Sequence, residues 1–209
     1  MSDIDAKAYW ENVLGYPLDS WLGISGSALK ECYTTLGVVS ARWNSAENMM
    51  RLFTAHYTKI PERFRAIITR HLGNVSMVDI LSDCADIAEK DSPDFLEAIK
   101  FLCDMFSRCR ENRNTLIHSG LVLDLEKRAA QRIEKPIGPR SAEVKTYLCT
   151  VDDIKRIADD IDRLNGLFLN LTYALDSREN PSRYTHHTPT DFLRLCKFQL
   201  PNKLPQQSL

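Results

Sequence analysis

The sequence of 209 residues has no excess of positive or negative charge, no long apolar run and no N-terminal pattern typical of a signal peptide. Its 27 Lys and Arg residues balance 28 Asp and Glu residues, and the formal net charge is −1. This balance excludes a protein coated with positive charge for nucleic acid, so any contact with RNA has to be local. No apolar stretch approaches the roughly 18 residues of a membrane span. The first residues, Met-Ser-Asp-Ile-Asp, are acidic and unlike a signal peptide. We therefore expect a cytoplasmic protein without membrane contact.

The patterns of metal binding and covalent catalysis are also missing. The six cysteines are scattered without a Cys-x-x-Cys pair, which favours reduced thiols over a zinc site or a disulfide framework. His186 and His187 are adjacent, so they lack the spacing of metal ligands on a helix or strand. No Ser, Cys or Thr has a base placed beside it. The sequence predicts no metal and no other cofactor.

The apolar residues, in contrast, are ordered along most of the chain. They make up 44% of the sequence and recur at steps of three and four, as in amphipathic helices. We expect long helices at about 28–58, 77–90, 93–119 and 151–176, and a shorter one from Pro61 to near Gly73. Ser76–Asp79 and Thr150–Asp153 match capping boxes. The predicted fold class is all-α, a helical bundle of four to five main helices.

The helical pattern breaks between residues 121 and 149. Leu121–Leu125 and Val144–Cys149 are β-prone and partly alternating, which predicts a small β-hairpin with a long loop between the last two long helices. The loop is basic, and it is either a solvated loop or an arm that contacts phosphates. Its candidate substrate-binding residues are Arg128, Arg132, Lys135 and Arg140.

The predicted organisation has three parts. Residues 1–27 form a lead-in, residues 28–177 the helical domain with its 121–149 insertion, and residues 178–209 a partly flexible tail. Within the tail, residues 190–198 are expected to form a short helix that docks on the domain.

The most distinctive segment lies at the end of the predicted 93–119 helix. The apolar stripe of this helix has one gap, which is filled by Arg113. A guanidinium on a face turned to the core is costly unless a carboxylate, a carbonyl or a bound anion meets it. Asn114 and His118, four residues apart, share a second face, and Gly120 is a typical helix stop. A cation, an amide and an imidazole at one helix end can together bind and act on a phosphate.

An acceptor for Arg113 is available on the first long helix. Glu47 lies four residues after Trp43, at the edge of the apolar seam of that helix. It is either an exposed carboxylate or the partner of Arg113.

The string Arg113–Gly120, RNTLIHSG, resembles the signature of the HEPN superfamily, an Arg often followed by Asn, Asp or His, and a His four to six residues on. Arg42–Glu47, RWNSAE, resembles the W-N-x-x-E stretch on the first long helix of many such domains. The resemblance covers roughly residues 28–177. It implies a compact helical domain that commonly dimerises and in many members is a metal-independent endoribonuclease.

The leading hypothesis is an endoribonuclease that cleaves RNA by attack of its own 2′-hydroxyl. His118 would transfer protons, because imidazole titrates near neutral pH. Arg113 would bind phosphate oxygens, Asn114 would orient the phosphate or the imidazole, and Glu47 would hold Arg113. The resemblance further implies a homodimer with two motifs in one cleft, acting as a toxin or antiviral-defence effector with a possible antitoxin or defence-complex partner.

The alternative is a non-catalytic HEPN-like module for dimerisation or partner binding. In it Arg113 and Glu47 form a buried ion pair, and His118 caps the helix end. A DNA-binding regulator is a weak third option, because no helix has a basic recognition face.

Overall fold

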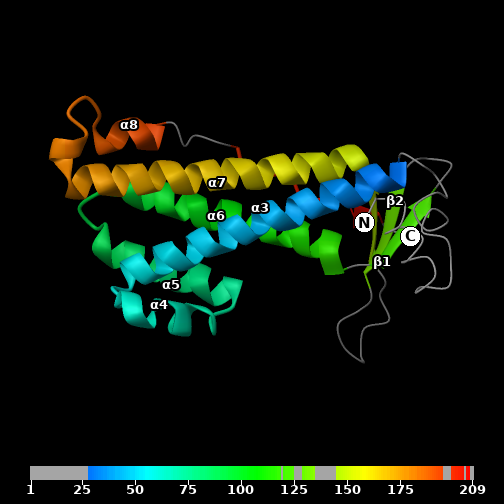
Figure 1. The fold of residues 1–209 in the computed structure, drawn as a ribbon, viewed down its shortest axis with the longest axis horizontal. Helices are drawn as coiled ribbons and strands as arrows, with labels where there is room; N and C mark the ends of the chain where they lie inside the picture. Colours follow the sequence, from blue (N-terminus) through cyan, green and yellow to red (C-terminus); the bar gives the residue numbers. More distant parts are fainter. Residues whose placement is uncertain are drawn as a thin grey trace, which may run out of the picture.

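The computed structural model describes residues 28–118, 120–124, 129–134, 145–194, 199–204 and 206–207. These residues form a helical bundle, as the sequence predicts (Figure 1). The long helices are α3 (Ala28–Tyr57), α5 (Asn74–Ala88), α6 (Pro93–His118) and α7 (Val151–Glu179). The short ones are α4 (Glu62–Thr69), the 3-10 helix η1 (Pro181–Arg183) and α8 (Pro189–Arg194).

The helix boundaries follow the predicted ones with three differences: α4 ends at Thr69 and not near Gly73, α5 begins three residues early, and α7 extends to Glu179. The predicted helices 28–58, 93–119 and 151–176 correspond to α3, α6 and α7. Thr150 forms the predicted capping box, since its hydroxyl accepts from the Asp153 amide at 3.1 Å and the Asp153 carboxylate accepts from the Thr150 amide at 3.0 Å. The box predicted at Ser76 is wrong: α5 has Gly73 at its N-cap, so Ser76 lies inside the helix.

Three aromatic rings join the long helices into one core. The ring of Trp43 on α3 lies 4.8 Å from that of Phe106 on α6, and Phe168 on α7 lies 6.4 Å from Phe106. All three residues are fully buried. The buried face of α5 adds Met77, Leu81 and Ala85 to the same cluster.

The directions of the helices decide which residues can meet. Arg178, near the end of α7, stacks over Phe95 near the start of α6 at 4.3 Å and binds Glu89 just before α6. Tyr57, at the end of α3, also binds Glu89. Both α3 and α7 are therefore antiparallel to α6, and the end of α6 lies beside the starts of α3 and α7 (Figure 1).

A small antiparallel sheet stands at that end of the bundle. Its strands are β1 (Gly120–Asp124), β2 (Ala129–Glu134), β3 (Lys145–Thr150) and β4 (Gln206–Gln207), in the order β1-β2-β3-β4. The expected insertion between the last two long helices is present, but it has one strand more than predicted. That strand, β2, lies in the stretch expected to be loop and separates the two predicted strands.

The tail packs back on the bundle. Its expected docking helix is α8, which ends at Arg194, and residues 195–198 lie outside the described residues. Residues 199–204 return to α6, where the Asn112 side chain donates to the carbonyl of Asn202 at 2.9 Å and accepts from the amide of Leu204 at 3.2 Å. The predicted lead-in, residues 1–27, is likewise outside the described residues. None of the helices described combines the length and the apolar character needed to cross a membrane.

Candidate functional site

The predicted motif occupies the last turn and a half of α6. His118 is the last residue of the helix, and Gly120 opens β1 two residues later. His118 is exposed, whereas Arg113 and Asn114 are half-buried. The motif therefore lies at the surface, where the helix bundle meets the sheet (Figure 1).

The side chains of Arg113, Asn114 and His118 come together at one guanidinium nitrogen. Arg113 Nη1 donates to Asn114 Oδ1 at 3.0 Å and lies 3.1 Å from His118 Nε2. A guanidinium can only donate, so a hydrogen bond here makes Nε2 the acceptor, which requires the tautomer with its proton on Nδ1. The contact thus positions an imidazole lone pair beside a permanent cation.

The other side of the Arg113 guanidinium is turned inward. Its Nε is buried and has no hydrogen-bond partner within the part of the chain that the structure describes, a feature that it shares with the Nε atoms of Arg51 and Arg156. Buried donors are usually paired, because an unpaired one costs about 1–3 kcal/mol. Arg113 therefore sits at a cost to stability that its contacts with Asn114 and His118 do not explain.

Glu47 does not join this group. Its carboxylate accepts from the Asn74 amide at 2.5 Å and lies 3.9 Å from Arg51 Nη2. The predicted pairing with Arg113 is not made, because α3 and α6 are antiparallel. The contact between Trp43 on α3 and Phe106 on α6 gives a common reference level. Glu47 lies one helical turn from this level toward one end of the bundle, and Arg113 lies two turns from it toward the other end. At 1.5 Å per helical residue, the two lie about 16 Å apart along the bundle.

The predicted phosphate-contacting arm is described only at Arg132. This residue lies in β2, paired through its backbone with Leu121 of β1 and Tyr147 of β3. Leu121 follows His118 by three residues, so the backbone of Arg132 lies close to the end of α6. Arg128, Lys135 and Arg140 lie outside the described residues.

Asn112 is the residue beside the motif that sequence reasoning missed. It directly precedes Arg113, is only 3% exposed, and uses both ends of its amide to hold the returning tail. Lys203 adds an ion pair with Glu111 at 3.1 Å. The polar run Arg-Glu-Asn-Arg-Asn gives no sign of which residue is buried, so only the position of the tail identifies it.

Comparisons with protein-family models, curated proteins and solved structures found no match. The assignment of this site therefore depends on its geometry and on the motif resemblance.

The buried thiols near the motif are unsuited to nucleophilic chemistry. Cys103 and Cys109 lie on the core side of α6, and burial raises the pKa of each thiol to about 12. Both are protonated near neutral pH, so neither supplies a thiolate. Within the described ranges, no three His, Cys, Asp or Glu residues are grouped as a metal site would require.

A second cluster of charged residues lies at the opposite end of the bundle. The buried carboxylate of Glu89 accepts two hydrogen bonds from Arg178, at 2.6 and 3.0 Å, and one from the Tyr57 hydroxyl at 2.8 Å. Burial alone would raise the pKa of Glu89, but these hydrogen bonds outweigh it and lower the pKa. Both carboxylate oxygens are paired, so this cluster holds α3, α5 and α7 together and is not a candidate ligand site.

Proposed function

We propose that the protein is a metal-independent endoribonuclease with Arg113 and His118 at its active site. The observation that carries the proposal is the 3.1 Å contact between a half-buried guanidinium and an exposed imidazole at the end of α6. The unpaired buried Nε of Arg113 does not add to this support, because the Nε atoms of Arg51 and Arg156 are buried and unpaired in the same way.

The chemistry needs these groups, a second proton-transfer group and the substrate. His118 removes the proton of the RNA 2′-hydroxyl, and the 2′-oxygen attacks the adjacent phosphorus. Arg113 stabilises the negative charge of the crowded phosphorane, and Asn114 orients the phosphate or the imidazole. The bond to the 5′-oxygen breaks, and that oxygen takes up a proton from the second copy of the motif in the proposed homodimer. The products are a 2′,3′-cyclic phosphate and a 5′-hydroxyl.

The Arg113–His118 contact suggests how the site is held before substrate binds. His118 Nε2 accepts from Arg113 Nη1 in the structure. A phosphate group that draws the guanidinium donors to its own oxygens would release the Nε2 lone pair for the 2′-hydroxyl. The two residues would then act in sequence, with binding of the phosphate preceding proton transfer.

A single histidine cannot easily act on both sides of the phosphorus. We propose a homodimer in which a second motif supplies the other proton transfer. The roles as toxin or antiviral-defence effector, and a control by an antitoxin or defence-complex partner, are proposed from the HEPN resemblance alone.

The competing proposal is a non-catalytic module for dimerisation or partner binding. As stated from the sequence, this alternative requires a buried ion pair between Arg113 and Glu47 and a His118 that serves only to cap the helix. The pairing of Glu47 with Asn74 weighs against that form, whereas an exposed His118 at the end of α6 is compatible with either role. The module itself remains the alternative if no RNA is cleaved.

The test is RNA cleavage in EDTA by the full chain and by His118→Ala and Arg113→Ala. Each variant should lower the rate by about 10²- to 10⁴-fold while helix content by circular dichroism stays unchanged. Matched controls are Arg110→Ala, three residues earlier on α6, and His71→Ala, an exposed histidine outside α6. Full activity in His118→Ala would refute the site, and absence of cleavage by the wild type across a panel of RNAs would favour the non-catalytic module.

A further inference from the structure

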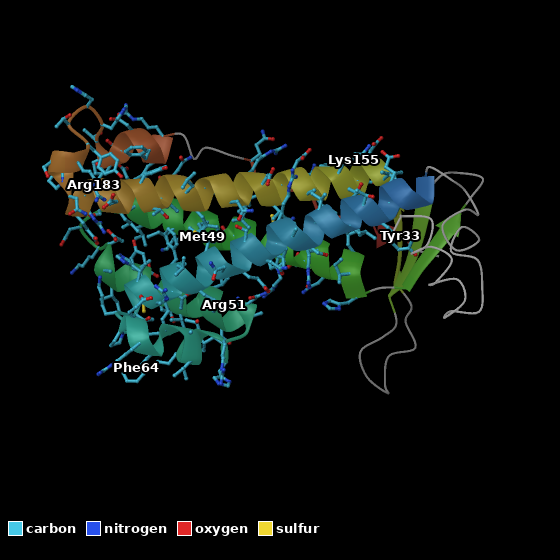
Figure 2. The ribbon with its side chains drawn as sticks, in the orientation of Figure 1. Tyr33, Met49, Arg51, Phe64, Lys155 and Arg183 are labelled. Carbon is cyan, nitrogen blue, oxygen red and sulfur yellow. The ribbon has the colours of Figure 1, made fainter. Side chains whose placement is uncertain are left out.

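Helix α4 exposes to solvent an apolar face of the kind that folded proteins normally bury. Phe64, Ile67 and Ile68 occupy one side of it, at the i, i+3 and i+4 positions. They are 43, 54 and 41% exposed, and Val75 in the first turn of α5 is 54% exposed. We call these four residues the α4 patch. Figure 2 shows Phe64 on the outer side of α4, away from α3 and α7.

The opposite side of α4 does not account for this exposure. Thr69 is its one buried residue, so the helix has no apolar face packed on the core. A helix formed for the stability of the bundle would turn Ile67 and Ile68 inward. The arrangement instead resembles the apolar centre of a protein–protein interface seen without the partner protein.

The rim of the α4 patch is cationic. Residues 59–71 contain four cations, Lys59, Arg63, Arg65 and Arg70, and one acid, Glu62. This segment carries +3, and since the whole chain carries −1, the remainder carries −4. Arg63 is held 4.8 Å above the ring of Phe64, which places its guanidinium at the edge of the apolar surface. On α5, Asp79 follows Val75 by one turn.

We propose that the α4 patch binds an acidic amphipathic segment of another protein. The occupant presents apolar side chains to Phe64, Ile67 and Ile68. Its carboxylates face Arg63 and Arg70, since Arg65 is already paired with Glu62. Arg suits this role because its planar fork binds a carboxylate at two points. Arg and aromatic residues also contribute most strongly to protein interfaces. This site lies at the end of the bundle opposite the motif (Figure 1), so the proposal is independent of the ribonuclease activity.

The same features argue against other occupants. A second copy of the chain joined through the same patch would bring two cationic rims together. RNA would find three aliphatic side chains, which neither stack on bases nor hydrogen-bond to them, and a single aromatic ring, Phe64, that Arg63 already covers. A membrane-surface helix has one continuous apolar face, whereas this patch is divided between α4 and the start of α5.

The test uses a synthetic helical peptide with Leu along one face and Glu on both flanks, labelled for fluorescence anisotropy and titrated with the full chain. Ile67→Glu should weaken its binding by at least about tenfold, and Ile87→Glu should not change it. Ile87 is the matched control, since it is 81% exposed on α5 but outside the patch. Arg63→Glu combined with Arg70→Glu should reverse the preference, so that a Lys-flanked peptide binds and the Glu-flanked one does not.

Parallel measurements decide between occupants. Peptide binding that is lost in Ile67→Glu and kept in Ile87→Glu supports the proposal. Failure of the Glu-flanked peptide to bind, or equal binding of a scrambled peptide with the same composition, overturns it. So does binding to phosphatidylserine vesicles or to an RNA oligomer in place of the peptide, or a dimer that Ile67→Glu converts to monomer in sedimentation.

Discussion

Replacing Glu89 by Gln removes a buried charge that accepts three hydrogen bonds. The change keeps the size of the side chain but removes the charge that Arg178 and Tyr57 bind. Glu89 is 2% exposed, so its carboxylate has little access to water once a partner is lost. The perturbation therefore tests how much the junction of α3, α5 and α7 contributes to stability.

The expected loss can be bounded from the geometry. Three hydrogen bonds to a charged group are worth about 1.5–3 kcal/mol each at most, but Gln can still accept from Tyr57 or one nitrogen of Arg178. The side chain of Arg178 is 36% exposed, so water can solvate it when the pairing is lost. We therefore expect Glu89→Gln to lower the free energy of unfolding by about 3 kcal/mol, the lower end of the range for a broken buried ion pair. The lower end applies because solvent screening reduces the contribution of Arg178.

Urea denaturation at pH 7 measures the effect, with Asp86→Asn as the matched control. Asp86 lies on the same helix and pairs with Lys100 at 2.8 Å, but both side chains are about half exposed. The control should lose less than about 1 kcal/mol. An equal loss in the two variants would refute the reasoning that burial sets the value of the Glu89 pairing.

The pH dependence gives a second check. Because the folded pKa of Glu89 is lowered, the folded state binds fewer protons than the unfolded state between the two pKa values. The stabilisation is thus complete above the ordinary glutamate pKa of about 4.3 and is lost as pH falls through the folded value. The difference between wild type and Glu89→Gln should shrink between pH 5 and pH 3, and a constant difference would contradict the charged pairing.

Three further substitutions test other parts of the structure. Lys59, between α3 and α4, has a left-handed φ of 56°, so Lys59→Gly should raise the free energy of unfolding by about 1 kcal/mol in urea denaturation. Asn112→Ala should cost about 1–3 kcal/mol and speed amide exchange at Leu204, because both hydrogen bonds that hold the tail are lost. Burial, with Lys59 nearby, lowers the pKa of His56, so the unfolded state binds the extra proton and stability falls as pH drops through about 6.5. The urea midpoint of His56→Gln should therefore fall less between pH 7 and pH 5 than the urea midpoint of the wild type.

The long helices could be predicted because a single local signal decides them. The apolar steps along α3, α6 and α7 produce one buried stripe in any arrangement of the bundle, and the core of Trp43, Phe106 and Phe168 follows from those stripes. The capping box at Thr150 is equally local. The same pattern at Ser76 misleads, because α5 already begins at Asn74, whose side-chain amide donates to Glu47 on α3.

The features that sequence did not predict depend on pairing between distant segments. Ala129–Glu134 is rich in residues that favour helices, yet it is a strand because β1 and β3 flank it. The partner of Glu47 depends on the direction of α6 relative to α3, which spacing within one helix cannot give. At the candidate site, the sequence brought Arg113, Asn114 and His118 together correctly, because all three lie within two turns of one helix.

Arg113 offers the sharpest distinction between an active site and a structural pair. If Arg113 is retained for catalysis, its buried unpaired Nε is a cost that the protein carries for activity. Arg113→Met keeps the length of the stem and removes that donor, so it should abolish RNA cleavage and raise the free energy of unfolding by about 1 kcal/mol. If Arg113 instead holds the end of α6 in place, Met should destabilise the chain by about 2 kcal/mol or more. Urea denaturation and cleavage measured on the same preparation separate the two, because only a catalytic arginine gains stability while losing activity.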